Sequence, residues 1–518
     1  MYWVAGIFAA VIAAFANRYG YHRDELYFMA AGRRLDWGYA DQPPLTPLLA
    51  RAMTAIDPDS LVLLRLPALA AATLVVLCAG WMAGAFGGGR GARALAAATV
   101  AGAALTLGAG HMLNTAVFDL AAWSVICLLT VRLLRGAPAD HAVAGRAASA
   151  DRDPLADGRA SETHDEVTTD GPRVTLSGAD SRWWLAIGAV AGLGMQNKML
   201  LILPVVVLVA CVLVVGPRTI FATGYLPAAV GLAVLIWLPS LLWQARNGWP
   251  QWELSRAIAG GSSGTSDTPI MFVLSQFGLM GPLLAPLWIF GWWRLWRDRR
   301  YRAFAVSYAV LFALFLVTGG KAYYLGGMYP ILLAAAAVPV ARWLGGHRVR
   351  WAAAGSVVAV NACAGAILFL PVLPVSALPD SPVLAINYDA GETVGWPEFV
   401  RNVGEVRARL GPDIAILTDN YGEAGAIERF GAPYDLPTPH SGHNAYWWWG
   451  PPDDSAAEVL TIGIDREQLD RYCAEVESAG RIDNGLGIEN DEQGVSMNIC
   501  RGPRVPWSEL WPRIRHLG

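Results

Sequence analysis

Long apolar segments alternate with short polar ones over the first 373 residues of the chain. Nine of these segments are long enough to cross a bilayer as helices, which takes about 20 residues each. They lie near residues 2–19, 61–84, 94–112, 117–135, 221–243, 270–293, 303–318, 326–344 and 352–373. A further apolar stretch, 183–215, is interrupted by a polar Gln-Asn-Lys triplet and predicts two short helices that meet at a polar tip. The pattern therefore predicts about eleven transmembrane helices.

The pattern changes after Pro374. A Pro-rich linker, 374–390, leads into short strand-like runs at 414–418 and 459–464, each followed by a helix-like stretch, at 423–430 and 466–478. Alternation of strands and helices is typical of an α/β domain. The sequence thus predicts a transmembrane domain over 1–373 and a soluble α/β domain over 391–518.

The arginines indicate how the spans are oriented. They cluster at 90–93, 132–135, 218, 294–302 and 342–350, on one side of the membrane when successive spans alternate in direction. Cytoplasmic loops are enriched in Lys and Arg, so this side is predicted to be cytoplasmic, and the polar segment 136–181 is predicted to be a disordered loop on it. The C-terminal domain and the loops 20–60, 111–116, 196–198, 244–269 and 319–325 are then extracytoplasmic. Loop 20–60 carries four arginines against this tendency, and we interpret it as a structured, functional loop.

Composition supports a membrane protein and narrows the partners. The chain is 54% hydrophobic and 16% charged, with a mean hydropathy of +0.37, which is too apolar for an ordinary soluble protein. Its net charge is only −3, without a long basic run, so membrane lipids rather than nucleic acid are expected to surround it. Cys473 and Cys500 are the two cysteines of the predicted outer domain and are expected to form a disulfide.

Carboxylates and a rigid Pro-Pro pair gather in the first outer loop. Asp24 and Glu25 follow the first span, and Asp41 and Gln42 precede the two prolines. A carboxylate partly shielded at the membrane face suits a general base, because shielding moves its pKa toward the working range. The alternative is ordinary solvated loop charge.

Lysine is rare in this chain. Of 39 basic residues only Lys198 and Lys321 are lysines, and both lie at predicted outer ends of helices. A compact ammonium group binds phosphate well. The alternative is that both side chains reach into lipid headgroups.

Several further positions are candidates. The polar set His111, Asn114 and Asp119 surrounds another outer loop, and Asp119 lies just inside a span, where an ionisable group suggests function or a structural hydrogen bond. Arg256 lies in a Gly- and Ser-rich loop that would either close over a phosphate or act as a linker. No third ligand accompanies the His-x-x-His spacing at 440–443, so no metal site is predicted there. The three tryptophans 447–449 would stack on sugars or lie at the membrane interface, and we prefer the interface.

The motifs DELYF, DQPPLTPL, QNK and GGKAYYLGGMYP resemble those of the glycosyltransferase C superfamily. The likeness is to its bacterial family 39-like members, which are relatives of protein O-mannosyltransferases and of the lipid A aminoarabinose transferase. It covers roughly residues 1–373 by topology and motif. The fold it implies is a polytopic α-helical protein of the bacterial plasma (inner) membrane with an extracytoplasmic α/β domain.

The resemblance also implies a reaction. An inverting enzyme would move a sugar from a polyprenyl-phosphate donor to a hydroxyl of a protein, lipid or polysaccharide acceptor. Asp24 would be the catalytic carboxylate and Glu25 would assist or orient it. The donor phosphate would be held by Lys198, Lys321, Arg256, Tyr323 and Tyr324. Gln42 stands where the aminoarabinose transferases commonly have a lysine, so the identity of the sugar and the contacts to the phosphate stay open. Whether the reaction needs a divalent cation also stays open.

Rival interpretations differ in where they place the polar residues. A transporter or lipid flippase would concentrate ionisable groups near the middle of the membrane, whereas here they cluster at the outer face. A membrane-anchored binding protein would not need eleven spans. No glycine-rich nucleotide-binding motif follows a predicted strand, which disfavours a nucleotide-sugar donor.

Overall fold

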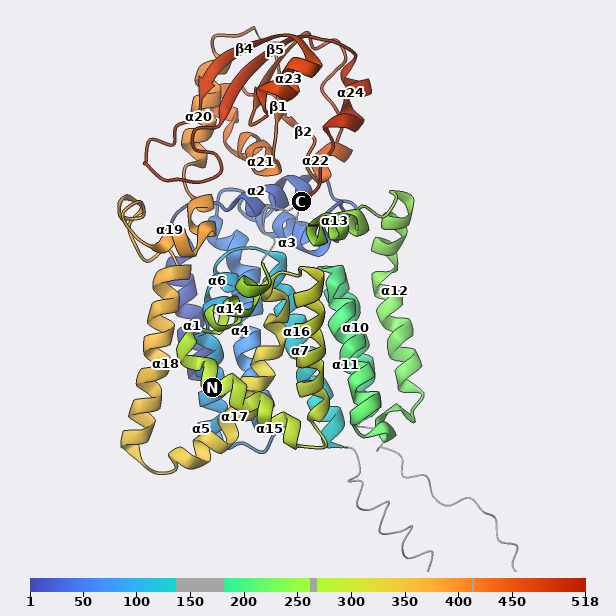
Figure 1. The fold of residues 1–518 in the computed structure, drawn as a ribbon, viewed down its shortest axis with the longest axis vertical. Coiled ribbons are helices and arrows are strands. Elements are labelled where there is room, and N and C mark those ends of the chain that lie inside the picture. Colours follow the sequence, from blue (N-terminus) through green and yellow to red (C-terminus); the bar gives the residue numbers. More distant parts are fainter. Residues whose placement is uncertain (137–180, 261–267, 412–413) are drawn as a thin grey trace, which may run out of the picture.

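The computed structural model describes residues 1–136, 181–260, 268–411 and 414–518. Residues 137–180 of the loop that was predicted to be disordered lie outside this part of the chain. A bundle of long helices forms one end of the molecule and a domain with a five-stranded sheet forms the other (Figure 1). Between them lies a layer of three shorter helices, α2 (Arg23–Arg33), α3 (Leu45–Thr54) and α13 (Pro250–Ala259).

The helices of the bundle follow the apolar segments of the sequence. They are α1 (Tyr2–Phe15), α4 (Leu61–Ala85), α5 (Arg90–Ala101), α6 (Ala104–His111), α7 (Thr115–Arg135), α10 (Trp183–Met195), α11 (Ile202–Val215), α12 (Tyr225–Arg246), α14 (Pro269–Met280), α15 (Ala285–Arg297), α16 (Arg302–Thr318), α17 (Tyr329–Leu344) and α18 (Arg348–Phe369). Short 3₁₀ turns join some of them: η2 (Met199–Leu201), η3 (Arg218–Phe221), η4 (Pro282–Leu284) and η5 (Ala322–Met328).

Five helices in the described part of the chain are long and apolar enough to span a membrane, or up to seven if each bent pair counts as one span. Four more apolar helices are shorter, including α1, which ends at Phe15 rather than continuing toward Tyr19. The number of eleven spans therefore stays a prediction. The two short helices predicted within 183–215 are present as α10 and α11.

Two predicted spans are broken, and one side chain serves both breaks. The pair α5 and α6 bends by 63° after Gly102, and α14 bends by 85° into η4 and α15 at Gly281. Asn361 of α18 donates hydrogen bonds to the carbonyl oxygens of Gly102 (2.9 Å) and Met280 (3.1 Å). A broken helix inside a membrane needs such partners for its freed carbonyl groups. Gly281 has a φ of +86°, and a Cβ there would lie 2.1 Å from the Asn361 side chain, so glycine is required.

The C-terminal domain is a mixed sheet with short helices on it. Its elements after the linker turns η6 (Val375–Ala377), α19 (Val383–Ile386) and η7 (Tyr388–Thr393) are α20 (Trp396–Arg407), β1 (Ala415–Thr418), α21 (Tyr421–Phe430), η8 (Ala432–Tyr434), β2 (His440–Ser441), α22 (Ala445–Trp448), β3 (Glu458–Ile462), α23 (Arg466–Tyr472), β4 (Cys473–Arg481), β5 (Ser496–Pro503) and α24 (Trp507–Ile514). The strand order is β2-β1-β3-β5-β4, with β1 parallel to both neighbours and β5 antiparallel to both of its own.

One helix that the sequence predicted in this domain is present only in part. The helix-like stretch 466–478 is helical only as α23, and its second half is strand β4. The Ala- and Glu-rich residues of β4 favour a helix on their own, but pairing with β5 along the edge of the sheet outweighs that preference. The predicted disulfide between Cys473 and Cys500 is present, with Cα atoms 5.6 Å apart, and it links these two strands.

Helix α2 belongs structurally to the C-terminal domain. Its apolar residues Leu26, Phe28 and Ala30 share one hydrophobic cluster with Phe399 of α20 and Ile427 of α21. Along the chain, however, α2 follows the first helix of the bundle directly. The residues predicted as a first outer loop are therefore held by the C-terminal domain on one side and by the bundle on the other.

Candidate active site

Asp24 lies in the first turn of α2, at the interface with the C-terminal domain. His22 caps this helix: its Nδ1 accepts a hydrogen bond from the Asp24 N–H at 3.2 Å. One carboxylate oxygen of Asp24 accepts a hydrogen bond of 2.8 Å from the Tyr421 hydroxyl of α21. The carboxylate is half-buried, so its position is fixed while part of it stays accessible.

Glu25 is buried, and both of its carboxylate oxygens have hydrogen-bond partners. Its two oxygens accept hydrogen bonds from the Arg65 guanidinium of α4 at 2.9 and 2.7 Å, from the His22 N–H at 2.9 Å and from the Leu113 N–H at 2.9 Å. Arg65 is itself buried and also donates to the carbonyl oxygens of Ala16 and Gly20. Glu25 thus ties α2, α4 and the end of α6 together beside Asp24.

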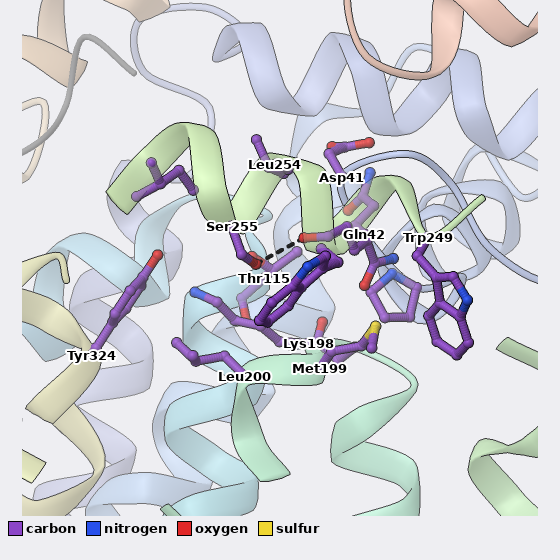
Figure 2. A pocket seen from close by; sticks show the side chains of 15 residues that line it. Asp41, Gln42, Thr115, Lys198, Met199, Leu200, Trp249, Leu254, Ser255 and Tyr324 are labelled. Atoms are coloured by element: carbon purple, nitrogen blue, oxygen red, sulfur yellow. Dashed lines mark hydrogen bonds between the residues drawn. The ribbon is translucent and has the colours of Figure 1, made fainter. Parts of the chain in front are cut away.

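A cavity of about 530 Å³ lies below α13, between the start of α7, the end of α10 and the loop that contains Asp41 (Figure 2). Polar and aromatic side chains share its wall. They include Asp41, Gln42, Thr115, Asn197, Lys198, Trp249, Gln251, Trp252, Ser255 and Tyr324. The cavity is large enough to hold a small polar headgroup.

Two residues of the QNK triplet, Asn197 and Lys198, line this cavity. Gln196 donates a hydrogen bond to the Ile236 carbonyl oxygen of α12 at 2.5 Å. Asn197 donates to the Thr115 carbonyl oxygen at 2.7 Å and accepts from the Thr46 hydroxyl at 2.8 Å. The first two residues of the triplet are thereby anchored, and the third, Lys198, extends its side chain into the cavity.

Lys198 packs against aromatic rings and forms no ion pair with a carboxylate of the described residues, although the Asp119 carboxyl lies within electrostatic range. Its Nζ lies 4.8 Å from the centroid of the Tyr323 ring and 4.6 Å from that of Tyr324. Two ring faces orient an ammonium group by cation–π attraction without neutralising its charge. The charge therefore stays available to an anion.

Lys321 lies close enough to Lys198 and Asp24 for their charges to shift its pKa. Burial and then the positive charge of Lys198 lower the pKa of Lys321 below its ordinary value, while the charge of Asp24 opposes this. The two lysines that the sequence singled out are thus close enough to repel each other. An anion between them would relieve that repulsion.

Asp41 and Gln42 face the cavity from the Pro-Pro loop. The Tyr27 hydroxyl donates a hydrogen bond of 2.5 Å to Asp41, and burial raises the pKa of Asp41 to about 7. Gln42 is 3% exposed, and neither its amide nitrogen nor its oxygen has a hydrogen-bond partner within the described residues. A buried, unpaired amide is costly in a folded protein, so Gln42 is a candidate ligand-binding group.

A chain of aromatic contacts joins the cavity to Asp24. The Tyr27 ring lies 4.8 Å from the ring of Tyr421, centroid to centroid. Tyr27 holds Asp41 and Tyr421 holds Asp24. The two carboxylates are thus connected through two neighbouring tyrosines.

The remaining candidates from the sequence are Asn114, His111, Asp119 and Arg256, and at least the first has a structural role. Asn114 caps α7 by accepting from the Val117 N–H at 2.8 Å, and its amide donates to two carbonyl oxygens, so its hydrogen bonds are structural. His111 is buried with Nδ1 unpaired, and one oxygen of Asp119 is likewise unpaired, within the described residues. Arg256 lies over the Trp252 ring at 5.6 Å, beside the cavity wall.

Among the described residues, no set of three or more His, Cys, Asp or Glu side chains is arranged to hold a metal ion. His440 and His443 each have a ring nitrogen near a main-chain oxygen, of Gly450 at 3.0 Å and of Gly518 at 3.2 Å.

Sequence reasoning did not single out Tyr421, and it placed Arg256 in a loop rather than on helix α13. Tyr421 lies in the DNYGEAGAIERFG segment, where Asn420 and Glu423 form a capping box that predicts a helix start. Nothing in that segment shows that the helix faces Asp24. Trp249 adopts a left-handed backbone with φ +61° ahead of α13, and only the structure shows that this turn places α13 over the cavity.

The chain shares its overall fold with solved structures of ArnT, which agrees with the fold that the sequence resemblance implied. ArnT from Cupriavidus metallidurans in the apo state is 13% identical, with a TM-score of 0.57 and 96% of each chain covered. ArnT from the same organism bound to undecaprenyl phosphate is 14% identical, with a TM-score of 0.58, 96% of this chain and 97% of that chain covered. No family model and no curated protein sequence matches the chain.

Proposed function

We propose that this protein is an inverting glycosyltransferase that uses a polyprenyl-phosphate sugar as donor and an acceptor hydroxyl on the outer face of the membrane. The proposal rests on the contacts that connect Asp24 with the cavity that Lys198 lines. Tyr421 donates a hydrogen bond to Asp24 and packs on Tyr27, and Tyr27 donates a hydrogen bond to Asp41 in the cavity wall. A single displacement needs a base on one side of the sugar and cations on the other. The fold of an ArnT bound to undecaprenyl phosphate supports a lipid-linked donor.

In the proposed reaction the acceptor oxygen attacks the anomeric carbon of the donor sugar. The bond between that carbon and the phosphate oxygen breaks, and its electron pair stays on the phosphate. The acceptor proton moves to the Asp24 carboxylate, which acts as general base. Inversion follows because attack and departure occur on opposite faces of the sugar.

The two lysines would stabilise the phosphate as its charge grows. Lys198 projects into the cavity, and Lys321 lies within electrostatic range of it. Cations placed in advance at a developing negative charge lower the barrier more than they strengthen binding of the ground state. Arg256 would approach from α13, above the cavity.

Gln42 would contact the donor from the opposite wall of the cavity. Its amide has one oxygen acceptor and two N–H donors, and none of them is used within the described residues. An amide in place of a cation favours hydrogen bonds to sugar hydroxyls or to an uncharged phosphate-ester oxygen. Glu25 would orient the Asp24 turn through Arg65 rather than take a proton.

Purified protein in detergent, incubated with a panel of radiolabelled polyprenyl-phosphate sugars and a membrane extract as acceptor, tests this proposal. We expect transfer from at least one donor, with water-soluble nucleotide sugars inactive. Asp24→Asn should abolish transfer and leave folding intact, because the amide has nearly the same shape but cannot accept the proton. Near wild-type turnover by Asp24→Asn would refute the assignment of the base, and transport of intact donor without transfer would favour a flippase.

A further inference from the structure

A second cavity, of about 490 Å³, lies where the bundle meets the C-terminal domain. Its wall comes from three places in the chain: the loop after α2, the end of α12 and helix α22. Three tryptophans line it, Trp243, Trp448 and Trp449. Two of them belong to the run of three tryptophans that the proposed reaction leaves without a role.

Two of these rings are set in fixed positions. The Trp243 Nε1 donates a hydrogen bond of 2.6 Å to Asp36, and a Cβ on Gly38 would lie 2.9 Å from the same ring. Trp448 lies 6.4 Å from Trp243, centroid to centroid, and Arg515 lies 4.9 Å from the Trp448 centroid on α22. The rings are therefore oriented before any ligand arrives, which lowers the entropic cost of binding.

Polar groups with unused hydrogen-bonding capacity lie beside the rings. Arg246 is exposed and has no ion-pair partner within the described residues. The Asn247 amide donates to the Trp243 carbonyl oxygen at 2.9 Å, and its own oxygen accepts nothing from the described residues. The Trp448 Nε1 likewise has no acceptor there. Aromatic faces with donors and acceptors at their edges suit a pyranose ring, which has apolar faces and a rim of hydroxyls.

The loop between α2 and α3 separates this cavity from the one that Lys198 lines. Ala40 belongs to the wall of the tryptophan-lined cavity, and the next residue, Asp41, belongs to the wall of the lysine-lined cavity. Trp449 also lies 6.4 Å from Tyr27, the ring that packs on the Asp24 partner Tyr421. Two substrates that react with each other require neighbouring sites of this kind.

We propose that the tryptophan-lined cavity binds a saccharide of the acceptor, so that the hydroxyl to be modified belongs to a glycan or a glycolipid. This rests on the proposed function, because it assigns the second substrate of the same reaction. The sugar packs against the sides of Trp243 and Trp448 that line the cavity, and Arg246 and Asn247 hydrogen-bond its hydroxyls or acidic groups.

The test measures binding without turnover. Full-length Asp24→Asn protein in detergent is applied to an array of immobilised microbial oligosaccharides, alone and combined with Trp448→Ala, Trp448→Phe or Trp343→Ala. Trp343 is the matched control, since it is 65% exposed near the end of α17, away from both cavities. Thermal midpoints of all variants are measured alongside to exclude misfolding.

We expect at least one group of saccharides to be retained by the Asp24→Asn protein and by the Trp343→Ala control. Trp448→Ala should weaken this binding about tenfold or more, because the sugar loses the ring on which it packs, and phenylalanine should restore most of it. The proposal is overturned if the array retains no saccharide, or if Trp448→Ala binds as well as its control. Failure of the transferase itself is seen separately, in the donor assay, because the array needs neither donor nor base.

Discussion

Tyr421 donates a hydrogen bond of 2.8 Å to the carboxylate of Asp24, which lies 397 residues earlier in the chain. The C-terminal domain therefore contacts the proposed base directly, through a side chain of α21. In the same interface Arg429 of α21 forms an ion pair of 2.7 Å with Asp59, and Arg515 near the C-terminus pairs with Glu253 of α13 at 2.6 Å. These contacts hold the C-terminal domain against α2, α13 and the segment before α4, beside the proposed base.

Tyr421→Phe should slow the reaction without weakening donor binding. The ring would still pack on Tyr27, but Asp24 would lose the donor that holds its carboxylate. We expect kcat to fall about tenfold, as for the loss of one hydrogen bond to a charged group, with the donor KM unchanged. Tyr434→Phe, at an exposed tyrosine of the same domain, is the control. A rise in donor KM with constant kcat would argue against a positioning role.

Glu25→Gln should destabilise the protein more than Asp24→Asn does. The change leaves Arg65 buried with an uncompensated charge, and breaking a buried ion pair typically costs about 3–5 kcal/mol. The expected result is a clear drop in the thermal midpoint measured by tryptophan fluorescence in detergent. Glu405→Gln, which removes a carboxylate from an exposed pair, should have little effect. Equal midpoints for Glu25→Gln and wild type would contradict the structural role.

Lys198→Ala should weaken use of the donor by about 1–3 kcal/mol, the worth of one charge-assisted contact. Arginine should restore it only in part, because its planar guanidinium does not occupy the same place between Tyr323 and Tyr324. The same measurement on Lys321→Ala tests the second lysine. Steady-state kinetics with varied donor provide the measurement, and unchanged donor dependence in both alanine variants would mean that the lysines only contact headgroups.

Donor binding should weaken as the pH rises through about 7. Burial raises the pKa of Asp41 to about 7, so this carboxyl is neutral below that pH and negative above it, next to the donor phosphate in the proposed complex. A phosphodiester keeps its single charge over this range, so Asp41 supplies the change. The donor KM is measured between about pH 6 and about pH 8. Asp41→Asn should flatten the rise, and a wild-type KM that stays constant would contradict the assignment.

The disulfide between Cys473 and Cys500 should form only if the C-terminal domain reaches an oxidising compartment. Non-reducing mass mapping of protein from intact membranes is expected to find the bridged peptide. Reduction should lower the stability of the domain by about 3 kcal/mol, from the loop that the bridge closes. A cytoplasm-specific reporter fused after Gly518 should be silent, and a bright reporter together with two free thiols would place the domain inside.

Hydrophobic patterning predicted the bundle well, because lipid-facing and buried helices both need long apolar runs. It could not predict the bends at Gly102 and Gly281, since these depend on Asn361 from a distant helix. It also misread 473–478 as helix, because local preference for helix competes there with a strand partner that lies elsewhere in the sequence.

The sequence predicted which residues belong to the proposed site better than it predicted their surroundings, because the surroundings also depend on distant segments of the chain. Rarity singled out Lys198 and Lys321, and motif likeness singled out Asp24, each readable from a single stretch of chain. The different environments of the adjacent residues Asp24 and Glu25 were not readable. One is half-buried beside Tyr421 and the other is buried against Arg65, and that distinction exists only once three segments have come together.

The distance along the chain between Asp24 and Tyr421 also sets an order of assembly. Every residue that lines the lysine-lined cavity has been synthesised by Tyr324, whereas the partner of Asp24 is made nearly a hundred residues later. A chain that stops before Tyr421 would therefore lack the hydrogen bond that positions Asp24. In the proposed reaction, transfer would begin only after the last domain had been completed and had packed against α2.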